Sequence, residues 1–446
     1  MSAEAPGAGA TPSDHRRLWR LAAPVILSGL TVPLQTAVDA AVVGHLGDAA
    51  NLGGVALGGT IFVFLYWGLF CLRQGTTGLT AQAEGARNFG AAKLILARGL
   101  LVAIALGVLF VALGRPILWL GLEILGGSPE VQSAAGLYFL ARLFAAPASL
   151  ANFVILGWLL GRQRTRRSFL VQATVNLSNA GLAVLFVFGF RWGVVGVGAA
   201  TAIADYLGFV LGLALAWPLL ERGPLRRKEL LDRAALRRFF RVNRDLFLRT
   251  AALIATLAYF TRTGARLGAI PLAANALLLN FHTFTSYGLD GLALATESIV
   301  GAAVGRGDRA AFRRAVRAGL VSALLVALAF SALFLLLGPA ILRALTDIEP
   351  VREAALRLLP WAVATPLVSV WSFQFDGVFI GAIATRALRN TMVFALLVFF
   401  ASAPILVPRF GNDGLWAAFM LFMAARGAAQ AVVLPRIERG LAAGVG

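Results

Sequence analysis

The chain of 446 residues alternates long apolar runs with short polar segments over its whole length. The runs are about 20 residues long or longer, and a helix of that length crosses the ~30 Å hydrocarbon core of a bilayer. We therefore predict an all-α integral membrane protein. Its twelve expected transmembrane helices lie at residues 17–43, 52–82, 94–120, 130–160, 168–189, 194–219, 245–267, 270–304, 314–343, 350–381, 390–408 and 413–434.

The composition and the positions of the basic residues support this interpretation. Hydrophobic residues make up 59% of the chain and charged residues only 14%, too few for a water-soluble surface. Of the 40 Lys and Arg residues, 28 lie in the two tails and in alternate loops, and loops rich in these residues stay in the cytoplasm. We expect a multi-pass protein of the cell (inner) membrane with both termini in the cytoplasm. These loops also explain the net charge of +19, and since no DNA- or RNA-binding motif is present, no nucleic-acid partner is expected.

The longest hydrophilic segment follows the sixth predicted span and divides the chain in two. It contains an amphipathic, Arg-rich stretch that either lies on an anionic inner leaflet or forms a solvated connector. The expected organisation is a disordered cytoplasmic tail (1–16), an N-lobe of six spans (17–219), a cytoplasmic linker (220–244), a C-lobe of six spans (245–435) and a second cytoplasmic tail (436–446).

The two halves resemble each other at a fixed offset of 220 residues, which indicates an internal repeat. Each half has an even number of spans, so both start on the same side of the membrane and the repeats are parallel. Two such lobes enclose a central cleft, and rocking them opens it to either side in turn. The matching residues are Gly85 and Gly305, Gly99-Leu100 and Gly319-Leu320, Gly157 and Gly377, Gly161 and Gly381, and Thr165-Arg166 and Thr385-Arg386.

Asp39 is a lone carboxylate in the first apolar run, six residues after Pro33. A charged side chain near the middle of a bilayer costs about 2.5–3.5 kcal/mol on insertion scales, so such a residue is a functional candidate by default. Pro33 removes one backbone donor, and we expect the helix to bend near the carboxylate. The alternative is a buried polar residue that serves only helix packing.

Further polar residues lie inside the predicted spans of both lobes. Thr201 and Asp205 are four residues apart and therefore share one face of a helix. In the second lobe the intramembrane acids are Asp290, Glu297 and Asp376. These acids either bind substrate or pair with Arg249 or Arg262, whereas Arg73 and Arg142 are expected to be structural.

No catalytic arrangement is found, so an enzyme is not expected. The chain has no Walker-type phosphate loop and no nucleophile elbow. One cysteine, Cys71, allows no intrachain disulfide, and three scattered histidines do not form a His-rich metal site. No cofactor or bound metal is predicted. Transport driven by an ion gradient is the remaining function class.

The motifs resemble those of the multidrug and toxic compound extrusion (MATE) transporter family, in its DinF-like branch. The resemblance implies a V-shaped fold of two six-helix lobes that exports amphipathic, often cationic compounds in exchange for H⁺ or Na⁺. It also implies that Asp39 is the coupling carboxylate, with Asn179 and Thr201 among its polar partners. The motifs are Val38-Asp39 with Val43-Gly44-His45-Leu46-Gly47, the stretch from Arg73 to Gly85, Ala204-Asp205-Tyr206, Leu289-Asp290 to Gly301, and Phe375-Asp376 to Gly381.

One departure from the family pattern bears on the coupling ion. Relatives often carry Asn-x-x-Leu-Asp in the fifth span, but here Asn179-Ala-Gly-Leu182 is followed by Ala183. The missing carboxylate weakens a sodium site, so we predict a proton-coupled antiporter that exports small amphipathic molecules as a monomer. The alternatives are a lipid-linked precursor flippase, a Na⁺-coupled MATE exporter and a structural membrane scaffold. The predicted ion-coupling residues are Asp39, Asn179, Thr201 and Asp205, and the predicted substrate-binding residues are Asp290, Glu297, Asp376, Gln35, Trp67, Phe284 and Trp371.

Overall fold

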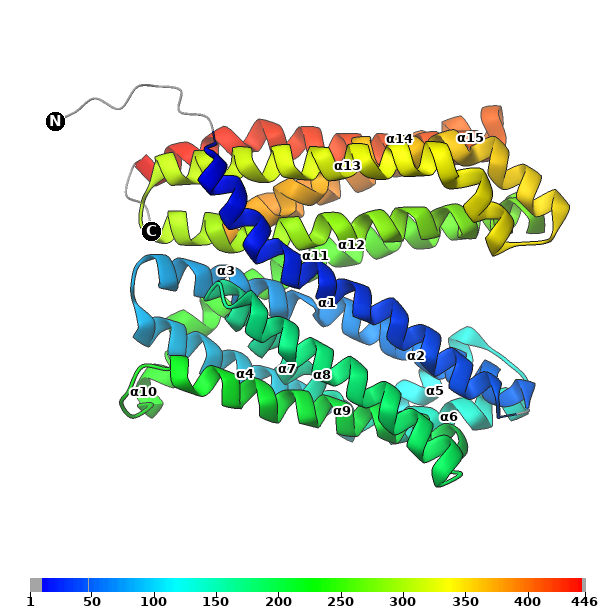
Figure 1. Ribbon diagram of the computed structural model, residues 1–446, viewed down its shortest axis with the longest axis horizontal. Helices are drawn as coiled ribbons and strands as arrows, with labels where there is room; N and C mark the ends of the chain where they lie inside the picture. The colour runs from blue at the N-terminus through cyan, green and yellow to red at the C-terminus, as the bar shows by residue number, and fades with distance from the viewer. Residues whose placement is uncertain (1–9, 47, 443–446) are drawn as a thin grey trace. The chain divides into compact units, whose positions relative to one another are not determined.

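The computed structural model describes residues 10–46 and 48–442, and this part of the chain is helical almost throughout, with no strand (Figure 1). The elements of the first half are α1 (Pro12–Gly44), α2 (Ala49–Leu69), α3 (Cys71–Gly85), α4 (Phe89–Ala112), α5 (Gly114–Leu125), α6 (Pro129–Leu143), α7 (Ala146–Gly161), α8 (Thr165–Val184), η1 (Leu185–Gly189), α9 (Gly193–Ala216) and η2 (Trp217–Leu219). Those of the second half are α10 (Arg227–Leu230), α11 (Arg233–Leu267), α12 (Ala269–Gly305), α13 (Arg309–Leu345), α14 (Glu349–Gly381) and α15 (Thr385–Ala442).

All twelve predicted spans lie in helical segments, so the predicted all-α membrane fold is confirmed. Seven helices of the described chain are long and apolar enough to cross a membrane, or eight if α6 and α7, which meet at 55°, form one bent span. The 58-residue helix α15 contains two predicted spans, which meet at Gly411 with a φ of 57°. The count of twelve crossings stays a prediction.

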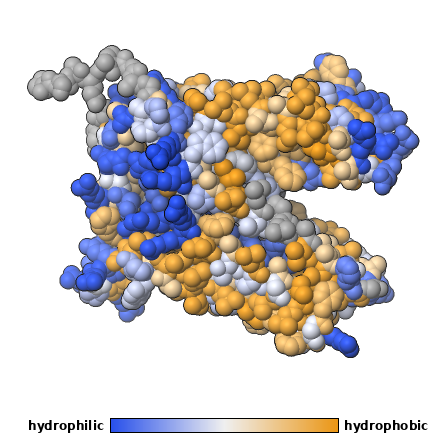
Figure 2. Space-filling view, viewed as in Figure 1, coloured by the Kyte–Doolittle hydropathy of each residue, from blue (hydrophilic) through white to orange (hydrophobic). Residues whose placement is uncertain are grey.

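The surface of the helices is that of a membrane protein. Figure 2 shows apolar side chains covering the flanks of the helices, whereas hydrophilic side chains gather at their ends. Leu335 and Leu336 of α13, for example, expose 65% and 75% of their surface. Large exposed apolar areas are costly in water and neutral in lipid, which accounts for a surface of this kind.

The chain forms two compact units. The N-terminal unit consists of Leu27–Asn243, and the C-terminal unit consists of Met1–Ile26 and Arg244–Gly446. Helices α1 and α11 each begin in one unit and continue in the other. In the C-terminal unit the first part of α1 packs on α12 and α13, where the His15 imidazole and the Ser322 hydroxyl are 3.1 Å apart. The predicted lobe boundaries at residues 219 and 245 stay predictions, since the units are defined by packing alone.

The predicted linker packs on the start of α4 within the N-terminal unit. The Arg98 guanidinium donates hydrogen bonds to the carbonyl oxygens of Glu229 and Leu230, with a distance of 3.1 Å from Nε to the Leu230 oxygen. The Lys93 ammonium donates to the carbonyl oxygen of Gly223. These bonds hold the segment around α10 against the basic end of α4.

The internal repeat is visible in the turns of the two units. Asn88 caps the start of α4 by accepting a hydrogen bond from the Ala91 N–H at 2.9 Å, and Asp308 caps α13 in the same way from Ala311 at 2.8 Å. Before each cap stands a residue with positive φ, Arg87 at 55° and Gly307 at 66°. Arg87 and Gly307 are 220 residues apart, as are Asn88 and Asp308, so the same turn occurs once in each unit.

The glycines that mark the repeat are sites of close helix packing. A Cβ at Gly157 of α7 would lie 3.1 Å from the carbonyl carbon of Arg73, and one at Gly377 of α14 would lie 2.9 Å from that of Ala293. The partner residues are also 220 apart. Glycine is needed at both positions because the backbones of the two helices touch. The predicted parallel repeat is therefore confirmed by the packing inside each unit.

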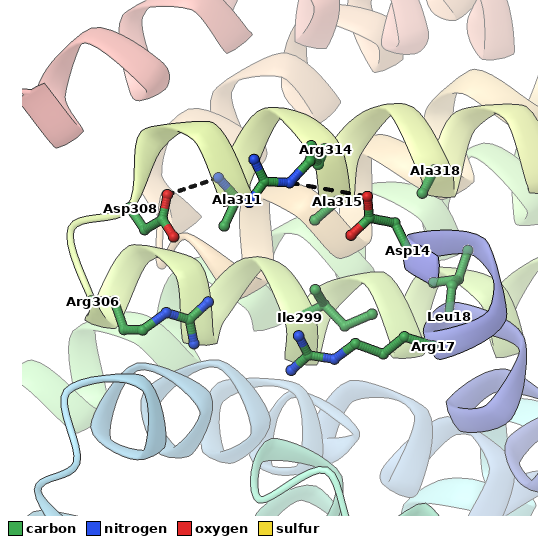
Figure 3. Close-up of a pocket in the computed structure, with 10 residues that line it drawn as sticks. All are labelled: Asp14, Arg17, Leu18, Ile299, Arg306, Asp308, Ala311, Arg314, Ala315 and Ala318. Carbon is green, nitrogen blue, oxygen red and sulfur yellow. Dashed lines mark hydrogen bonds and ion pairs between the residues drawn. The ribbon is translucent and has the colours of Figure 1, made fainter. Parts of the chain in front are cut away.

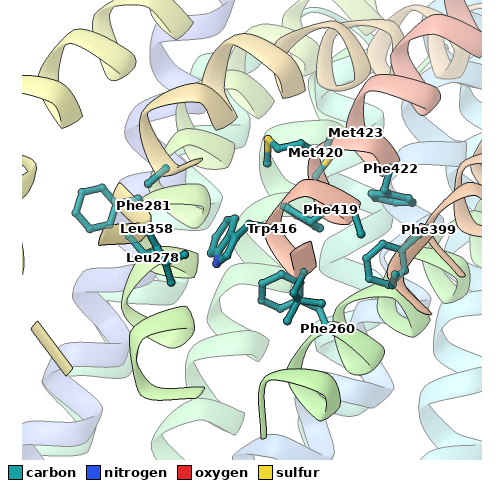
Figure 4. Packing of buried hydrophobic residues seen from close by; sticks show 14 of the residues in the cluster. Phe260, Leu278, Phe281, Leu358, Phe399, Trp416, Phe419, Met420, Phe422 and Met423 are labelled. Atoms are coloured by element: carbon teal, nitrogen blue, oxygen red, sulfur yellow. The ribbon is translucent and has the colours of Figure 1, made fainter. Parts of the chain in front are cut away.

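The C-terminal unit is organised around a large aromatic core, shown in Figure 4. Phe260 packs edge-on against Trp416 with ring centroids 5.3 Å apart. The Trp416 indole donates a hydrogen bond of 2.8 Å to the Asn275 side chain, which also pairs with Asn412. The buried polar groups are thereby satisfied inside an apolar core.

Candidate functional site

Asp39 lies in the second half of α1, within the N-terminal unit, and is half-buried. Its Oδ1 atom is inaccessible to solvent and has no hydrogen-bond partner among the described residues. The Gln35 side chain, one turn earlier on α1, hydrogen-bonds to the carboxylate. The side chain of Pro33 lies outside what the structure describes, and the predicted bend stays a prediction. The carboxylate is thus held within protein with part of its bonding capacity unused.

The helix segment that carries Asp39 is fixed by an apolar cluster. Val42 and Val43 of α1 pack with Phe62 of α2, Phe139 of α6 and Val197 of α9, and all five side chains are buried. Phe62 and Phe139 stack with ring centroids 4.7 Å apart. Since apolar neighbours surround the end of α1, the position of Asp39 is determined by core packing.

Asn179 and Thr201 form a buried polar pair between α8 and α9. The Asn179 side-chain amide donates a 2.8 Å hydrogen bond to the Thr201 hydroxyl, which donates to the carbonyl oxygen of Val197 at 3.1 Å. The other Asn179 atom, Oδ1, is buried with no partner among the described residues. The structure brings these two residues together, as a polar pair, and gives neither a hydrogen bond to Asp39.

A second connection ties α8 to α1. The Asn176 side-chain amide donates to the Thr31 hydroxyl, and Gln172 donates to the Asn176 carbonyl oxygen at 3.1 Å. Asn176 is itself buried. Asn176 of α8 therefore contacts α1 at Thr31, which is eight residues before Asp39 in the sequence.

Asp205 of α9 is bound by α7 rather than by α8. The Ser149 hydroxyl donates to Asp205 Oδ2, and the Asn152 amide lies 2.9 Å from the Asp205 backbone oxygen and 3.5 Å from Oδ1. Thr201 and Asp205 share one helix, as predicted, but they bond to different neighbours. The two small polar residues on α7, three apart in sequence, are the signal by which this contact could have been found.

Arg142 of α6 connects the two carboxylates electrostatically. Its charge acts on both Asp39 and Asp205. One of its nitrogens donates a 2.6 Å hydrogen bond to the Tyr138 hydroxyl, and the guanidinium lies over the Phe62 ring at 4.7 Å from the centroid. Arg142 was expected to be structural. Because its charge acts on both acids, Arg142 is a functional candidate, which its charge within a span already indicated.

An aromatic groove adjoins this charge cluster. It has a volume of about 250 Å³, and Arg142 is the one charged residue that lines it in the described chain. Trp67, a predicted substrate residue, contributes to the wall and exposes 41% of its surface. The aromatic side chains of such a groove can stack on a flat apolar molecule, and the Arg142 guanidinium provides one positive charge in its wall. The lining residues are Phe62, Val63, Tyr66, Trp67, Phe70, Arg142 and Phe153.

In the C-terminal unit Asp376 is saturated with partners. Arg249 and Arg426 both donate to Oδ2, and the Gln430 amide donates to Oδ1 at 2.7 Å. Of the two pairings considered from the sequence, that with Arg249 is present. Asp290 also acts electrostatically on both arginines. Two aspartates thus balance two buried arginines, the arrangement that a stable buried ion cluster requires.

The remaining predicted residues of this unit are Glu297, Phe284 and Trp371. Glu297 is buried on α12. Phe284 and Trp371 expose 54% and 43% of their surfaces, and neither pairs with another aromatic ring of the described chain. Sequence reasoning did not identify Arg426 and Gln430 as partners of Asp376. Their spacing of four residues, on one face of α15, was the available signal.

Comparisons with known proteins agree with the fold and the motifs. Residues 24–185 and 253–405 match the model of the MatE family. The chain is 41% identical over 426 residues to DNA damage-inducible protein F of Escherichia coli (strain K12), covering 95% of this chain and 93% of that protein. It is 29% identical over 444 residues to a probable multidrug resistance protein NorM of Rhizobium meliloti (strain 1021), covering 93% and 91%.

Solved structures show the same architecture. A multidrug resistance MATE family transporter of the MOP superfamily, in an outward-facing conformation, matches with a TM-score of 0.84 at 20% identity over 96% of both chains. A MOP superfamily transporter from Pyrococcus furiosus Vc1 (DSM3638) matches with a TM-score of 0.86 at 19% identity, over 96% of this chain and 97% of that one.

Proposed function

Because the chain belongs to the MatE family of membrane transporters, we propose that it is an antiporter that exports small amphipathic molecules in exchange for protons. The observation that carries the proposal is the Asp39 carboxylate, whose buried Oδ1 has no hydrogen-bond partner among the described residues. Its place in α1, next to a packed apolar cluster, lets a change in its charge act on helix packing.

A proton suits this carboxylate better than a sodium ion does. A proton needs one lone pair, and the unpartnered Oδ1 atom supplies it. A sodium ion needs several oxygen ligands around it. Ala183 stands where relatives carry a further carboxylate, and Asp205 is already bound by Ser149 and Asn152.

Arg142 gives the pair of acids a common partner. When Asp39 binds a proton it loses its attraction to the guanidinium, and Arg142 then interacts with Asp205 alone. Since Arg142 also lines the aromatic groove, this change would alter the charge that a substrate meets there. Proton binding and substrate release are coupled in this scheme through one side chain.

The groove sets the expected substrate class. Its aromatic walls favour flat, apolar ring systems, and an amphipathic compound would place its polar end near Arg142. Trp67 and Gln35 remain proposed substrate-binding residues, together with Phe284, Trp371, Asp290, Glu297 and Asp376 of the other unit. For Asp376, whose oxygens are occupied, we propose that substrate contact requires displacement of one arginine.

The test compares two driving forces in vesicles containing the purified protein. Efflux of a fluorescent amphipathic aromatic compound is measured under a pH gradient without Na⁺, and under a Na⁺ gradient at uniform pH with a protonophore. We expect efflux in the first condition only. Efflux in the second condition alone would refute proton coupling and favour the Na⁺-coupled alternative.

A further inference from the structure

The first part of α11, in the N-terminal unit, carries positive charge along one face. Arg233, Arg237 and Arg241 follow one another at intervals of four residues and therefore lie in one row along the helix, here called the arginine row. All three side chains are exposed. Phe240, three residues after Arg237, lies on the same face and exposes 53% of its surface. This face thus combines three positive charges with an exposed aromatic ring.

The other side of α11 fixes the direction of this face. Phe239 is buried, with 3% exposure. The Asn243 side chain lies so close to α3 that a Cβ at Gly75 would be 2.9 Å from its Oδ1. The Arg238 guanidinium donates a 3.4 Å hydrogen bond to Gln82, also of α3. Because one side of the helix is held on α3, the arginine row stays on the surface of the protein.

The segment before α11 adds exposed basic and apolar side chains. Arg226, Arg227 and Lys228 are exposed around the start of α10, which lies beside the basic end of α4 (Figure 1). Leu225 and Leu231 stand on either side of them and expose 48% and 42% of their surfaces. The hydrogen bonds from α4 to the backbone of this segment, described above, hold it in place.

The two acids of this stretch are directed away from the arginine row. Asp232 is the cap of α11, where its Oδ1 accepts a 2.7 Å hydrogen bond from the Ala235 N–H. Asp232 and Glu229 both act electrostatically on Arg98 of α4. Residues 222–241 contain eight basic side chains against these two acids. Like charges four residues apart on a helix repel each other, so an external anion would stabilise the row.

The C-terminal unit shows how basic side chains are balanced within the protein. Figure 3 shows Asp14 beside Arg314, with the carboxylate 3.9 Å from the guanidinium, in the cavity between α1 and α13. The charge of Asp14 also acts favourably on Arg17. By contrast, no arginine of the row on α11 forms an ion pair with a residue that the structure describes.

The position of the row determines which anion it would meet. We expect α11 to enter the membrane at residue 245, one turn after Arg241, which places the row at the depth of the lipid headgroups. Basic side chains there are attracted to an anionic leaflet, and exposed apolar side chains such as Phe240 enter the boundary between headgroups and acyl chains. Guanidinium groups also bind phosphate through paired N–H donors.

We propose that the arginine row and Phe240, together with the basic residues around α10, bind the headgroups of anionic phospholipids at the cytoplasmic surface of the membrane. This assigns the linker to the membrane surface and not to a solvated connector. The proposal is independent of the coupling ion and the substrate, because its tests measure lipid binding and not transport.

The first experiment uses the full-length protein in detergent. A triple variant with Arg233→Gln, Arg237→Gln and Arg241→Gln is compared with wild type. Binding of phosphatidylglycerol, with phosphatidylcholine as reference, is measured by native mass spectrometry. We expect the triple variant to bind phosphatidylglycerol at least about tenfold more weakly, since each basic side chain near an anionic headgroup contributes to the attraction. Binding of phosphatidylcholine should not change.

A second triple variant, with Arg16→Gln, Arg166→Gln and Arg386→Gln, makes the same change in charge elsewhere. These three arginines are exposed and lie in other segments that are predicted to be cytoplasmic. We expect this control to bind phosphatidylglycerol as the wild type does. Equal loss in both variants would overturn the proposal, because total charge would then explain the binding. Wild-type binding by the arginine-row variant would overturn it as well.

The second experiment leaves the arginine row and Phe240 intact, so it remains decisive if the first triple variant does not fold. Ala234→Cys places a thiol on an exposed position of α11, and the one native cysteine, Cys71, is buried. A fluorophore on this thiol is observed in vesicles that contain a phospholipid with a nitroxide quencher near its headgroup. We expect stronger quenching in vesicles with phosphatidylglycerol than in vesicles of phosphatidylcholine alone. The absence of quenching from both, or equal quenching in both, would contradict binding to anionic headgroups.

Discussion

Replacing one glycine of the repeat by alanine should separate two helices of the C-terminal unit. A Cβ at position 377 would lie 2.9 Å from the carbonyl carbon and 3.1 Å from the Cα of Ala293, whereas ordinary contacts begin at 3.4 Å. Because both neighbouring atoms belong to the backbone of α12, no side-chain rotation relieves the clash. The helices α12 and α14 must move apart by roughly 0.5 Å or more.

Two opposing effects determine how much Gly377→Ala changes the stability of the folded protein. Alanine favours a helix over glycine by about 1 kcal/mol. Overpacking in a tightly packed region costs typically 1–3 kcal/mol, and the backbone contact places this site at the upper end. We therefore expect a net loss of about 1–2 kcal/mol. The equivalent change Gly157→Ala, against Arg73 in the N-terminal unit, should behave alike.

Gly59 of α2 provides a matched control, because the same substitution there should leave stability unchanged or raise it. A Cβ there would meet no atom within 4 Å, so Gly59→Ala gains helix propensity without a clash. The assay is thermal unfolding of the detergent-solubilised protein, followed by loss of the monodisperse peak in size-exclusion chromatography. We expect a midpoint lowered by about 2–6 °C for Gly377→Ala and unchanged or raised for Gly59→Ala. A Gly377→Ala protein as stable as the control would refute the close helix approach.

Three further predictions address topology and the charged clusters. Cysteines at Arg164 and Arg386 should resist an impermeant thiol reagent in intact cells, because basic loops remain in the cytoplasm; labelling of both from outside would reverse the orientation. Asp376→Asn should lower stability by about 3–5 kcal/mol, since two buried arginines lose their partner, and an unchanged thermal midpoint would contradict this. Burial raises the pKa of Glu438, but bonds from two α13 arginines outweigh it and lower the pKa, so its stabilisation is present at neutral pH and lost in acid. Glu438→Gln should therefore be less stable than wild type at pH 7, and the difference should disappear as the pH falls through the lowered pKa of Glu438; a constant difference would exclude the ion pair as the cause.

Much of the fold could be predicted from hydrophobic run length, because a bilayer requires helices of one length with satisfied backbones. The break within α15 follows from Gly411, and the bend between α6 and α7 is next to Pro147. The break at Phe70, between α2 and α3, has no such signal. Local sequence therefore predicts a helix break only where Gly or Pro changes the backbone.

The candidate site was only partly predictable for a different reason. A lone acid such as Asp39 is conspicuous in an apolar run, since the membrane penalises its charge. Its neighbours depend on how each helix is rotated about its axis, which hydropathy does not determine. Asp205 bonds to Ser149 of α7 although Thr201, one turn away, bonds to Asn179 of α8.

The most direct test of the proposed mechanism measures proton movement caused by substrate. Vesicles containing the protein and a pH-sensitive dye are given a pH gradient, and a transported amphipathic aromatic compound is then added. We predict that wild type dissipates the gradient when substrate is added, that Asp39→Glu retains part of this flux, and that Asp39→Asn, equally well folded, shows none. A wild-type proton flux in the Asp39→Asn protein would show that this carboxylate does not couple protons to export.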